Sequence, residues 1–238
     1  MKKIEGQMRK AIQTYNLIQD GDKVAIGLSG GKDSLALLVG LSHLKQYCGI
    51  KFDIIAILVD NGNPTNTFGK LQEFCDSLSV PLHIIKSEIF DVVFNIRKEK
   101  NPCALCAKMR RGLLCTSARD LGANKLALGH HADDLIDTFF LSLFYEGRLS
   151  TFAPKSYLDK TGITVIRPLL FCYEDEIRSA TKNFPILKNP CPANGDTKRE
   201  EMKKLVADLE KKYHTNRELL FRAITSPESY NLFNKKAP

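Results

Sequence analysis

The chain has 238 residues, of which 43% are hydrophobic, and it carries a formal net charge of +8 at pH 7. This length is enough to bury a sizeable core, and no apolar run approaches the roughly 18 residues that suggest a membrane span. We therefore expect no membrane partner. Because the start at Met1–Gly6 lacks the apolar stretch of a secretory signal, we expect a cytoplasmic protein. The net positive charge would favour binding to a polyanion such as nucleic acid, although a solvated surface explains the charge equally well.

The first half of the chain is predicted to alternate between helices and strands. Met8, Ile12 and Ile18 recur at helical spacing, which indicates an N-terminal helix. Strands are expected at 24–27, 52–59, 81–85 and 125–129, with helices between them and a further helix from Leu135. This alternation predicts an α/β fold with a doubly wound, mostly parallel sheet.

A glycine-rich turn follows the first predicted strand and opens the next helix. It reads Leu28, Ser29, Gly30, Gly31, Lys32, Asp33, Ser34. Adjacent glycines allow a tight turn whose backbone N–H groups face an anion, and the helix N-terminus adds free donors and a positive dipole end. The spacing fits neither a Walker A loop nor a Gly-x-Gly-x-x-Gly turn. The turn therefore predicts a phosphate site of another type.

Two further polar turns follow predicted strands. The second strand ends at Val59, and the run Gly129-His130-His131-Ala132-Asp133-Asp134 follows the fourth. Open α/β sheets bind ligands at the carboxyl ends of their strands, so both turns are candidate walls of a nucleotide pocket. Asp133 and Asp134 could hold Mg²⁺ on the phosphates, or one could act as a general base. The alternative is that one of them caps the helix that follows.

Seven cysteines in a chain without a secretory signal favour metal ligands, reduced thiols or a nucleophile over disulfides. Cys103 and Cys106 have metal-ligand spacing on a loop that we expect to precede a helix from about Ala107, and Cys191 lies in a proline-bounded loop. Three thiolates could hold zinc with a fourth ligand, or three irons of a [4Fe-4S] cluster with one iron left open. The remaining cysteines are interpreted as packing residues: Cys48, Cys75, Cys115, Cys172.

A cluster of cations surrounds the first cysteine pair, and it could neutralise nucleic-acid phosphates or form a plain solvated face. Its members are Arg97, Lys98, Lys100, Lys108, Arg110, Arg111. Beyond Tyr145 the pattern changes to one short extended segment at 164–167 and to charged helices. We expect an N-terminal helix at 1–20, a nucleotide-binding domain at 21–170 and a helical C-terminal extension at 171–238 that carries Cys191.

These motifs resemble, in order, those of the TtcA/TtuA group of PP-loop tRNA thiolation enzymes, and most closely the TtcA branch, which forms 2-thiocytidine. The matching stretches are Tyr15-Asn16, 29–34, Cys103 to Cys106 with Arg110-Arg111-Gly112, 129–134, Ile166 to Leu169, Cys191 and 231–233. The resemblance implies an adenine-nucleotide α-hydrolase-like fold and ATP-dependent adenylation of a base carbonyl, at cytidine 32 of tRNA. A sulfur nucleophile then displaces AMP.

The resemblance also implies roles for particular residues. The [4Fe-4S] cluster would be held by Cys103, Cys106 and Cys191. We expect ATP to contact 28–34, Val59, Gly129 and His130, and catalysis to involve Asp33, Arg110, Asp133, Asp134 with Mg²⁺. Lys108, Arg110 and Arg111 are the expected tRNA contacts. The sulfur donor would be a cysteine desulfurase or free sulfide, and the resemblance suggests a homodimer.

Some features depart from the pattern and keep alternatives open. Arg110 stands where the thiouridine-forming branch tends to have a lysine, and no second cysteine closely follows Cys191. A 2-thiouridine-forming enzyme is therefore an alternative. So is a zinc-stabilised module that binds tRNA or nucleotide without thiolation. A lysidine synthetase or another PP-loop ligase would leave the three cysteines without a function.

Overall fold

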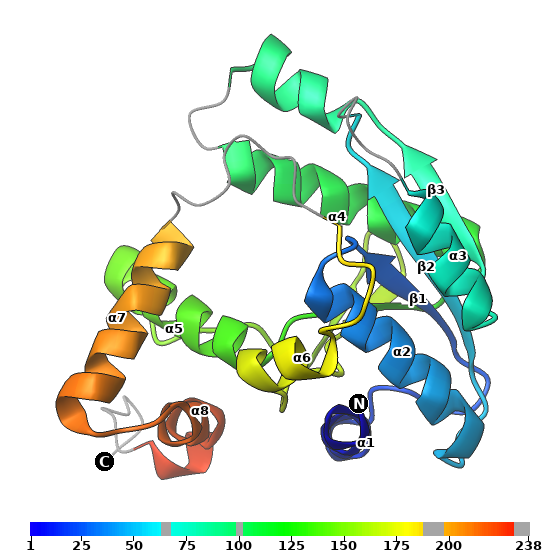
Figure 1. Cartoon of the computed structure of the whole chain (residues 1–238). Coiled ribbons are helices and arrows are strands. Elements are labelled where there is room, and N and C mark those ends of the chain that lie inside the picture. Colours follow the sequence, from blue (N-terminus) through cyan, green and yellow to red (C-terminus); the bar gives the residue numbers. More distant parts are fainter. Residues whose placement is uncertain (63–67, 99–101, 188–197, 231–238) are drawn as a thin grey trace. The chain divides into compact units, whose positions relative to one another are not determined.

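The computed structural model describes residues 1–62, 68–98, 102–187 and 198–230 (Figure 1). The chain packs into two compact units, one of Met1–His131 with Ala153–Asn194 and the other of Ala132–Phe152 with Gly195–Pro238. These limits differ from the three segments expected from the sequence, because the helix after His131 belongs with the C-terminal helices. Within the described residues, no helix is both long enough and apolar enough to cross a membrane.

The first unit is built on a six-stranded sheet with the order β3-β2-β1-β4-β6-β5. The strands are β1 Lys23–Leu28, β2 Asp53–Asp60, β3 Leu82–Lys86, β4 Lys125–Ala127, β5 Lys155–Leu158 and β6 Ile163–Ile166. All neighbours pair in parallel except β5, which pairs antiparallel with β6. The predicted doubly wound, mostly parallel sheet is confirmed.

Both faces of the sheet are buried, which is why its central strands are almost continuously apolar. Val24 and Ile26 of β1 pack with α1 and α2, whereas Ala25 belongs to a second cluster with Leu114 of α4. The helices of this unit are α1 Lys2–Tyr15, α2 Lys32–Tyr47, α3 Gly69–Ser77, α4 Pro102–Asp120 and α6 Glu174–Ala180, with a π-helical turn at Asp91–Ile96. Figure 1 shows α2 and α4 on opposite faces of the sheet.

Two elements differ from the sequence-based expectation. The strand β5 was not expected, because it is a short edge strand of alternating exposure that ends the sheet. Helix α4 begins at Pro102 rather than near Ala107, since proline is well suited to the first position of a helix. Cys103 and Cys106 therefore lie in the first turns of α4 and not on a preceding loop, as we had expected.

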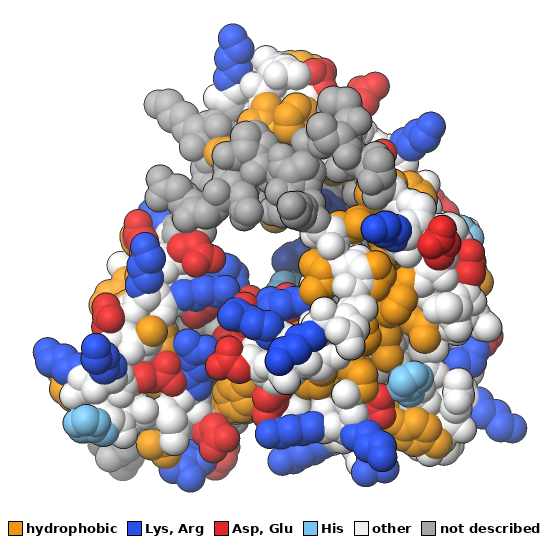
Figure 2. Space-filling view, in the orientation of Figure 1, with side chains coloured by type: hydrophobic (Ala, Val, Ile, Leu, Met, Phe, Trp, Pro, Cys, Tyr) orange, Lys and Arg blue, Asp and Glu red, His pale blue; other side chains and the backbone are white. Residues whose placement is uncertain are grey.

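The second unit is helical. It contains α5 Ala132–Glu146, α7 Lys198–Tyr213, α8 Arg217–Thr225 and a short 3-10 turn at Pro227–Ser229. Its apolar cluster is centred on Ile136 and Phe140 of α5 with Met202 and Val206 of α7. On the surface of α7 and α8, Lys and Arg are interspersed with Asp and Glu (Figure 2). Such a mixture is typical of a solvated face.

Candidate active site

The glycine-rich turn after β1 is held in shape by its own serines. Ser34 Oγ donates to the carbonyl of Gly31 at 2.9 Å and accepts from the backbone N–H of Ser29 at 3.2 Å. The two hydroxyls, Ser29 Oγ and Ser34 Oγ, lie 3.1 Å apart. Gly30 has φ +77°, a backbone conformation that glycine adopts without strain. These contacts fix the loop before any ligand binds, as an anion-binding loop requires.

Helix α2 starts directly from this loop, and no side chain caps its N-terminus. Gly31 is the N-cap residue and no side chain accepts a hydrogen bond there. The first N–H groups of a helix have no intrahelical carbonyl partner, and the dipole of this helix of 16 residues adds positive potential. The geometry is therefore that of a phosphate-binding helix N-terminus.

Lys32 supplies a cation at the same place. Its Nζ lies 3.0 Å from Asp33 Oδ2 and 3.0 Å from Glu174 Oε1 of α6, and its side chain is 23% exposed. Burial disfavours the ammonium charge, but the two carboxylates outweigh burial and raise the pKa of Lys32. Lys32 stays charged at neutral pH, so a phosphate can compete with Glu174 for it. Glu174 was not among the residues predicted for this site.

The turn after β4 packs against the first turn of α2. A Cβ on Gly129 would lie 3.1 Å from the backbone carbon and 3.2 Å from the backbone oxygen of Asp33, so a side chain would force the two segments apart. The buried His131 places Nε2 3.7 Å from Asp33 Oδ1. Strand register brings Val59 to the same edge, since Leu58 pairs with Leu28 immediately before the loop. The predicted ATP contacts thus meet at one sheet edge.

Asp133 and Asp134 lie in the first turn of α5, in the second unit. Asp133 is 4% exposed and pairs with Arg217 of α8, while Asp134 accepts a hydrogen bond from Arg199 Nη1 of α7 at 3.1 Å. The two carboxylates therefore join α5 to both C-terminal helices. Neither arginine partner was anticipated from the sequence, because both are remote along the chain. Mg²⁺ binding by these carboxylates stays a prediction.

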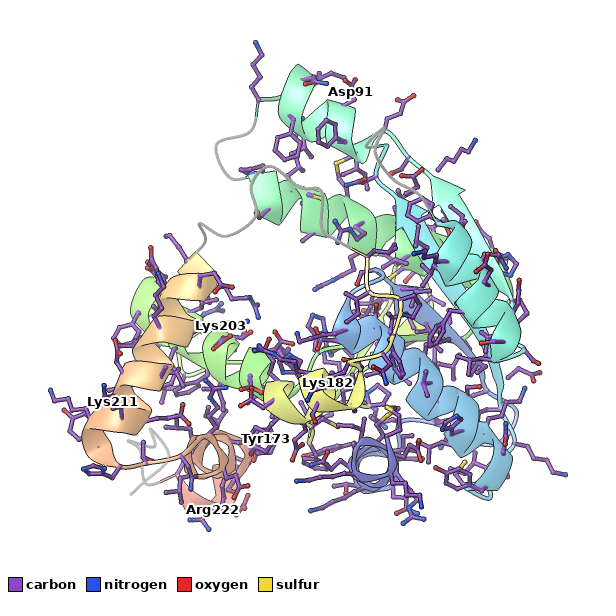
Figure 3. The ribbon with its side chains drawn as sticks, in the orientation of Figure 1. Asp91, Tyr173, Lys182, Lys203, Lys211 and Arg222 are labelled. Carbon is purple, nitrogen blue, oxygen red and sulfur yellow. The ribbon has the colours of Figure 1, made fainter. Side chains whose placement is uncertain are left out.

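One further carboxyl was missed by the sequence analysis. Asp137 lies one turn after Asp133, is 3% exposed, and its Oδ2 has no hydrogen-bond partner among the described residues. Burial raises the pKa of Asp137 to about 7, although Arg199 and Lys203 oppose the shift. Figure 3 labels Lys203, which lies on α7. The spacing of Asp137 from Asp133 on an apolar helix was the available signal.

Cys103 and Cys106 lie one helical turn apart at the start of α4, so they share a face of the helix. Both thiols are free; Cys103 is exposed and Cys106 is half-buried. Arg110 Nη2 donates to Cys106 Sγ at 3.4 Å. A free thiol pair at a helix N-terminus beside a guanidinium suits thiolate ligands of a metal or cluster. Cys191, the third predicted ligand, lies outside the described residues.

The other described cysteines are packing residues. Cys75, Cys115 and Cys172 are buried, and burial raises the pKa of each thiol, that of Cys75 to about 11. Neutral buried thiols are poor nucleophiles and metal ligands. Within the described part of the chain, no three His, Cys, Asp or Glu side chains form a group that could hold a metal ion.

The predicted tRNA contacts lie on α4. Lys108 and Arg111 are exposed and Arg110 is half-buried, so Lys108 and Arg111 present their charges to solvent. Arg167, at the end of β6, is buried, and burial together with the charge of Arg111 lowers its pKa to about 10. Lys100 lies outside the described residues. The cations next to the thiol pair thus form an exposed basic surface suited to phosphates.

The fold and loop define the class of protein. Residues 1–194 match the PP-loop domain family. The chain is 25% identical to the U34-tRNA thiolase NcsA from Methanococcus maripaludis, whose solved structure contains its [4Fe-4S] cluster; the TM-score is 0.74, and the match covers 94% of this chain and 76% of that one. The chain is a member of the PP-loop domain family.

Sequence relatives narrow the assignment. The chain is 40% identical to the tRNA-cytidine(32) 2-sulfurtransferase of Pseudomonas entomophila (strain L48), over 94% of this chain and 83% of the relative. It is 39% identical to the enzyme of the same name from Saccharophagus degradans (strain 2-40 / ATCC 43961 / DSM 17024), over 94% and 73%. The chain belongs to the tRNA-cytidine(32) 2-sulfurtransferase family, as the resemblance of its motifs implied.

Proposed function

We propose that this protein is an ATP-dependent tRNA sulfurtransferase that converts cytidine 32 of tRNA to 2-thiocytidine. The observation that carries the proposal is the presence, in one unit, of an intact phosphate loop and a free thiol pair beside a cation. Relatives that the match covers to 83% and 73% of their length carry this activity in their names. The enzyme class and the tRNA substrate both follow from this family membership.

The reaction needs two displacements. The C2 carbonyl oxygen of cytidine attacks the α-phosphorus of ATP, and pyrophosphate leaves with the electron pair of the broken P–O bond. A sulfide nucleophile then adds to C2, and AMP departs with the former carbonyl oxygen. Adenylation is required because a carbonyl oxygen is a poor leaving group, whereas AMP is a good one.

The phosphate loop would stabilise the first displacement. Negative charge develops on the departing pyrophosphate, next to the free N–H groups at the start of α2 and the ammonium of Lys32. The serine contacts hold these donors in place beforehand, so little reorganisation is needed during the reaction. Asp133 and Asp134 are the candidates for Mg²⁺ coordination, and Asp33 is a candidate catalytic residue of the loop. Gly129 and His130 are the candidates for contacts to the nucleotide.

The thiol pair fits two ligands of an iron-sulfur cluster. Cys103 and Cys106 would hold it together with Cys191, and the cluster, when bound, would supply an open iron for the transferred sulfur. Arg110 would contribute positive charge near the sulfur and the tRNA phosphates, since an arginine does not readily release a proton. Lys108 and Arg111 would bind the tRNA backbone.

The remaining partners come from the resemblance alone. The sulfur donor is proposed to be a cysteine desulfurase or free sulfide, the assembly a homodimer, and the compartment the cytoplasm. The second candidate function is 2-thiouridine formation, which the likeness to the U34-tRNA thiolase favours. The third is a zinc-stabilised tRNA- or nucleotide-binding module, which would need a fourth ligand besides the three cysteines.

Mass spectrometry of tRNA nucleosides tests the proposal. We expect cells that lack the gene to lose 2-thiocytidine and to regain it when the wild-type gene is restored, but not when Cys103→Ser is restored. Loss of 2-thiouridine instead would assign the protein to the second candidate function. Unchanged thiolated nucleosides, with stoichiometric zinc in protein purified anaerobically, would favour the binding module.

A further inference from the structure

Glu174, the first residue of α6, lies beside the cation of the phosphate loop. Its Oε1 is 3.0 Å from Lys32 Nζ, and its side chain is 14% exposed. Helix α6 lies next to α2 in the first unit (Figure 1). Asp33 Oδ2 is also 3.0 Å from the ammonium, so Lys32 is shared between a carboxylate of the loop and one from a distant part of the chain. The carboxylate from α6 thus pairs with the same ammonium that the proposed mechanism assigns to the phosphates.

The backbone that carries Glu174 is fixed to the rest of the first unit. Ile177, one turn later, is buried in the core. Glu176 pairs with Lys3 of α1 at 2.7 Å, and it accepts a hydrogen bond at 3.1 Å from the backbone N–H of Tyr173, which Figure 3 labels. These contacts hold the start of α6 in place. Lys32, rather than Glu174, therefore has to move when a phosphate takes the ammonium.

The segment after α6 holds the loop backbone as well. The backbone N–H of Leu187 donates to the carbonyl of Gly30 at 2.9 Å. A Cβ on Gly30 would lie 2.6 Å from Leu187 Cδ1, so the Leu187 side chain lies directly over this glycine. Because both backbones are held, the adaptable part of the ion pair is the flexible four-carbon stem of Lys32.

A second cation compensates the charge of Glu174. Arg178 Nη2, one turn further along α6, lies 3.3 Å from the same Oε1, and the Arg178 side chain is 65% exposed. A buried carboxylate without a cation would be costly, but Glu174 keeps Arg178 when Lys32 turns away. The ammonium can consequently pass from Glu174 to a phosphate without leaving a buried charge unpaired.

We propose that Glu174 is a positioning residue that competes with phosphate for the Lys32 ammonium and takes it back as pyrophosphate leaves. This inference rests on the proposed function, in which pyrophosphate is the first product. Lys32 stabilises the charge that develops on pyrophosphate, but the same attraction slows the release of that product. A carboxylate 3.0 Å from the ammonium offsets part of the attraction. Glu174 therefore weakens the binding of ATP and of pyrophosphate, and it speeds the departure of pyrophosphate.

Calorimetry with inorganic pyrophosphate and the full-length protein tests the competition. Glu174→Gln keeps the shape of the side chain and removes its charge, so we expect pyrophosphate to bind about fivefold more tightly than it binds the wild type. Asp175→Asn is the matched control, because it removes the same charge from the next residue of α6, which is exposed. Its affinity for pyrophosphate should change by less than about 1.5-fold, since solvent and salt screen an exposed charge.

A double-mutant cycle assigns the effect to the ion pair. In a Lys32→Ala background, Glu174→Gln should change pyrophosphate affinity by less than about 1.5-fold, because the competition needs the ammonium. A general change in the field around the loop would tighten binding equally in both backgrounds.

Turnover gives a readout that damage to the loop would not produce. Glu174→Gln should lower both the KM for ATP and the pyrophosphate concentration that half-inhibits AMP formation, each about fivefold. Single-turnover AMP formation at saturating ATP should match the wild type, because Lys32 is then already on the phosphates. A damaged loop would raise both constants instead.

The inference is overturned if Glu174→Gln binds pyrophosphate no more tightly than the wild type, or if the tightening persists in the Lys32→Ala background. Either result would leave the nucleoside assay, and with it the proposed function, untouched. Absence of pyrophosphate binding to the wild type would instead overturn the phosphate site and this inference together.

Discussion

Two polar clusters of this molecule contain the same kinds of side chain but hold them differently. At the phosphate loop, Lys32 and Asp33 are partly exposed, and Glu174 is one of two carboxylates on the same ammonium. On α5, Asp133 is almost fully buried and paired with Arg217. The first cluster can exchange a carboxylate for a phosphate at little cost, whereas the second cannot lose a partner without leaving a buried charge. Exposure thus separates the exchangeable ion pairs of Lys32 from the fixed ion pair of Asp133.

Removal of the Lys32 ammonium from the phosphate loop should give the largest effect on activity. Lys32→Ala removes the ammonium that would stabilise the departing pyrophosphate, so we expect AMP formation to fall about 10²- to 10³-fold. Unfolding free energy should change by no more than about 1 kcal/mol, since the pair is partly exposed. Lys45→Ala, on the exposed last turn of the same helix, is the control. If Lys32→Ala formed AMP at the rate of the control, Lys32 would not act at this site.

Removal of the buried carboxylate should instead act on stability. Asp133→Ala removes a buried charge-assisted hydrogen bond between α5 and α8, while Arg217 keeps its pair with Glu210, so we expect about 2 kcal/mol of destabilisation in urea unfolding. Asp134→Ala should cost less than about 1 kcal/mol, because the Arg199 side chain is 40% exposed. Equal losses in the two variants would contradict the contrast between a buried joint and an exposed pair.

Asp137 should make the second unit sensitive to pH. The folded pKa of about 7 lies above the ordinary value of 3.8, so the unfolded state binds fewer protons between these values and stability falls as pH rises. We expect the wild type to lose about 2 kcal/mol between pH 5 and pH 7 relative to Asp137→Asn, which cannot titrate. Parallel curves for the two proteins would show that this carboxyl is ionised throughout.

The smallest expected effect concerns the packing of the turn after β4 against the first turn of α2. Gly129→Ala places a methyl group 3.1 to 3.2 Å from the backbone of Asp33 and Ser34, so the first turn of α2 must shift by a few tenths of an ångström. We expect pyrophosphate binding to weaken about fivefold, or about 1 kcal/mol, by calorimetry. Gly69→Ala, where a Cβ meets no atom within 4 Å, should bind as the wild type does. Unchanged binding in Gly129→Ala would place the phosphates elsewhere.

The sequence predicted those parts of the site that depend on local pattern. The strand, the glycine-rich turn and the helix after it follow from neighbouring residues, as does the meeting of parallel strand ends near Gly129. The pairing of Glu174 with Lys32 and the position of Leu187 over Gly30 depend on long-range packing, which periodicity does not encode. The same holds for Asp133 and Arg217.

Local signals also failed in two instructive places. Pro102 favours a helix start, yet the cysteine spacing suggested a loop, so α4 was expected to begin too late. The edge strand β5 has alternating exposure over only four residues, which is too short for a reliable strand pattern. In both cases contacts with the sheet and its neighbours decide the structure.

The origin of the oxygen in AMP tests the central claim most directly. A tRNA that carries ¹⁸O at the C2 carbonyl of cytidine 32 would be incubated anaerobically with the protein, ATP and a sulfide source. We predict one ¹⁸O in each AMP, formed in equal amount with 2-thiocytidine. Unlabelled AMP, or thiolation without AMP, would contradict adenylation of the base at the phosphate loop.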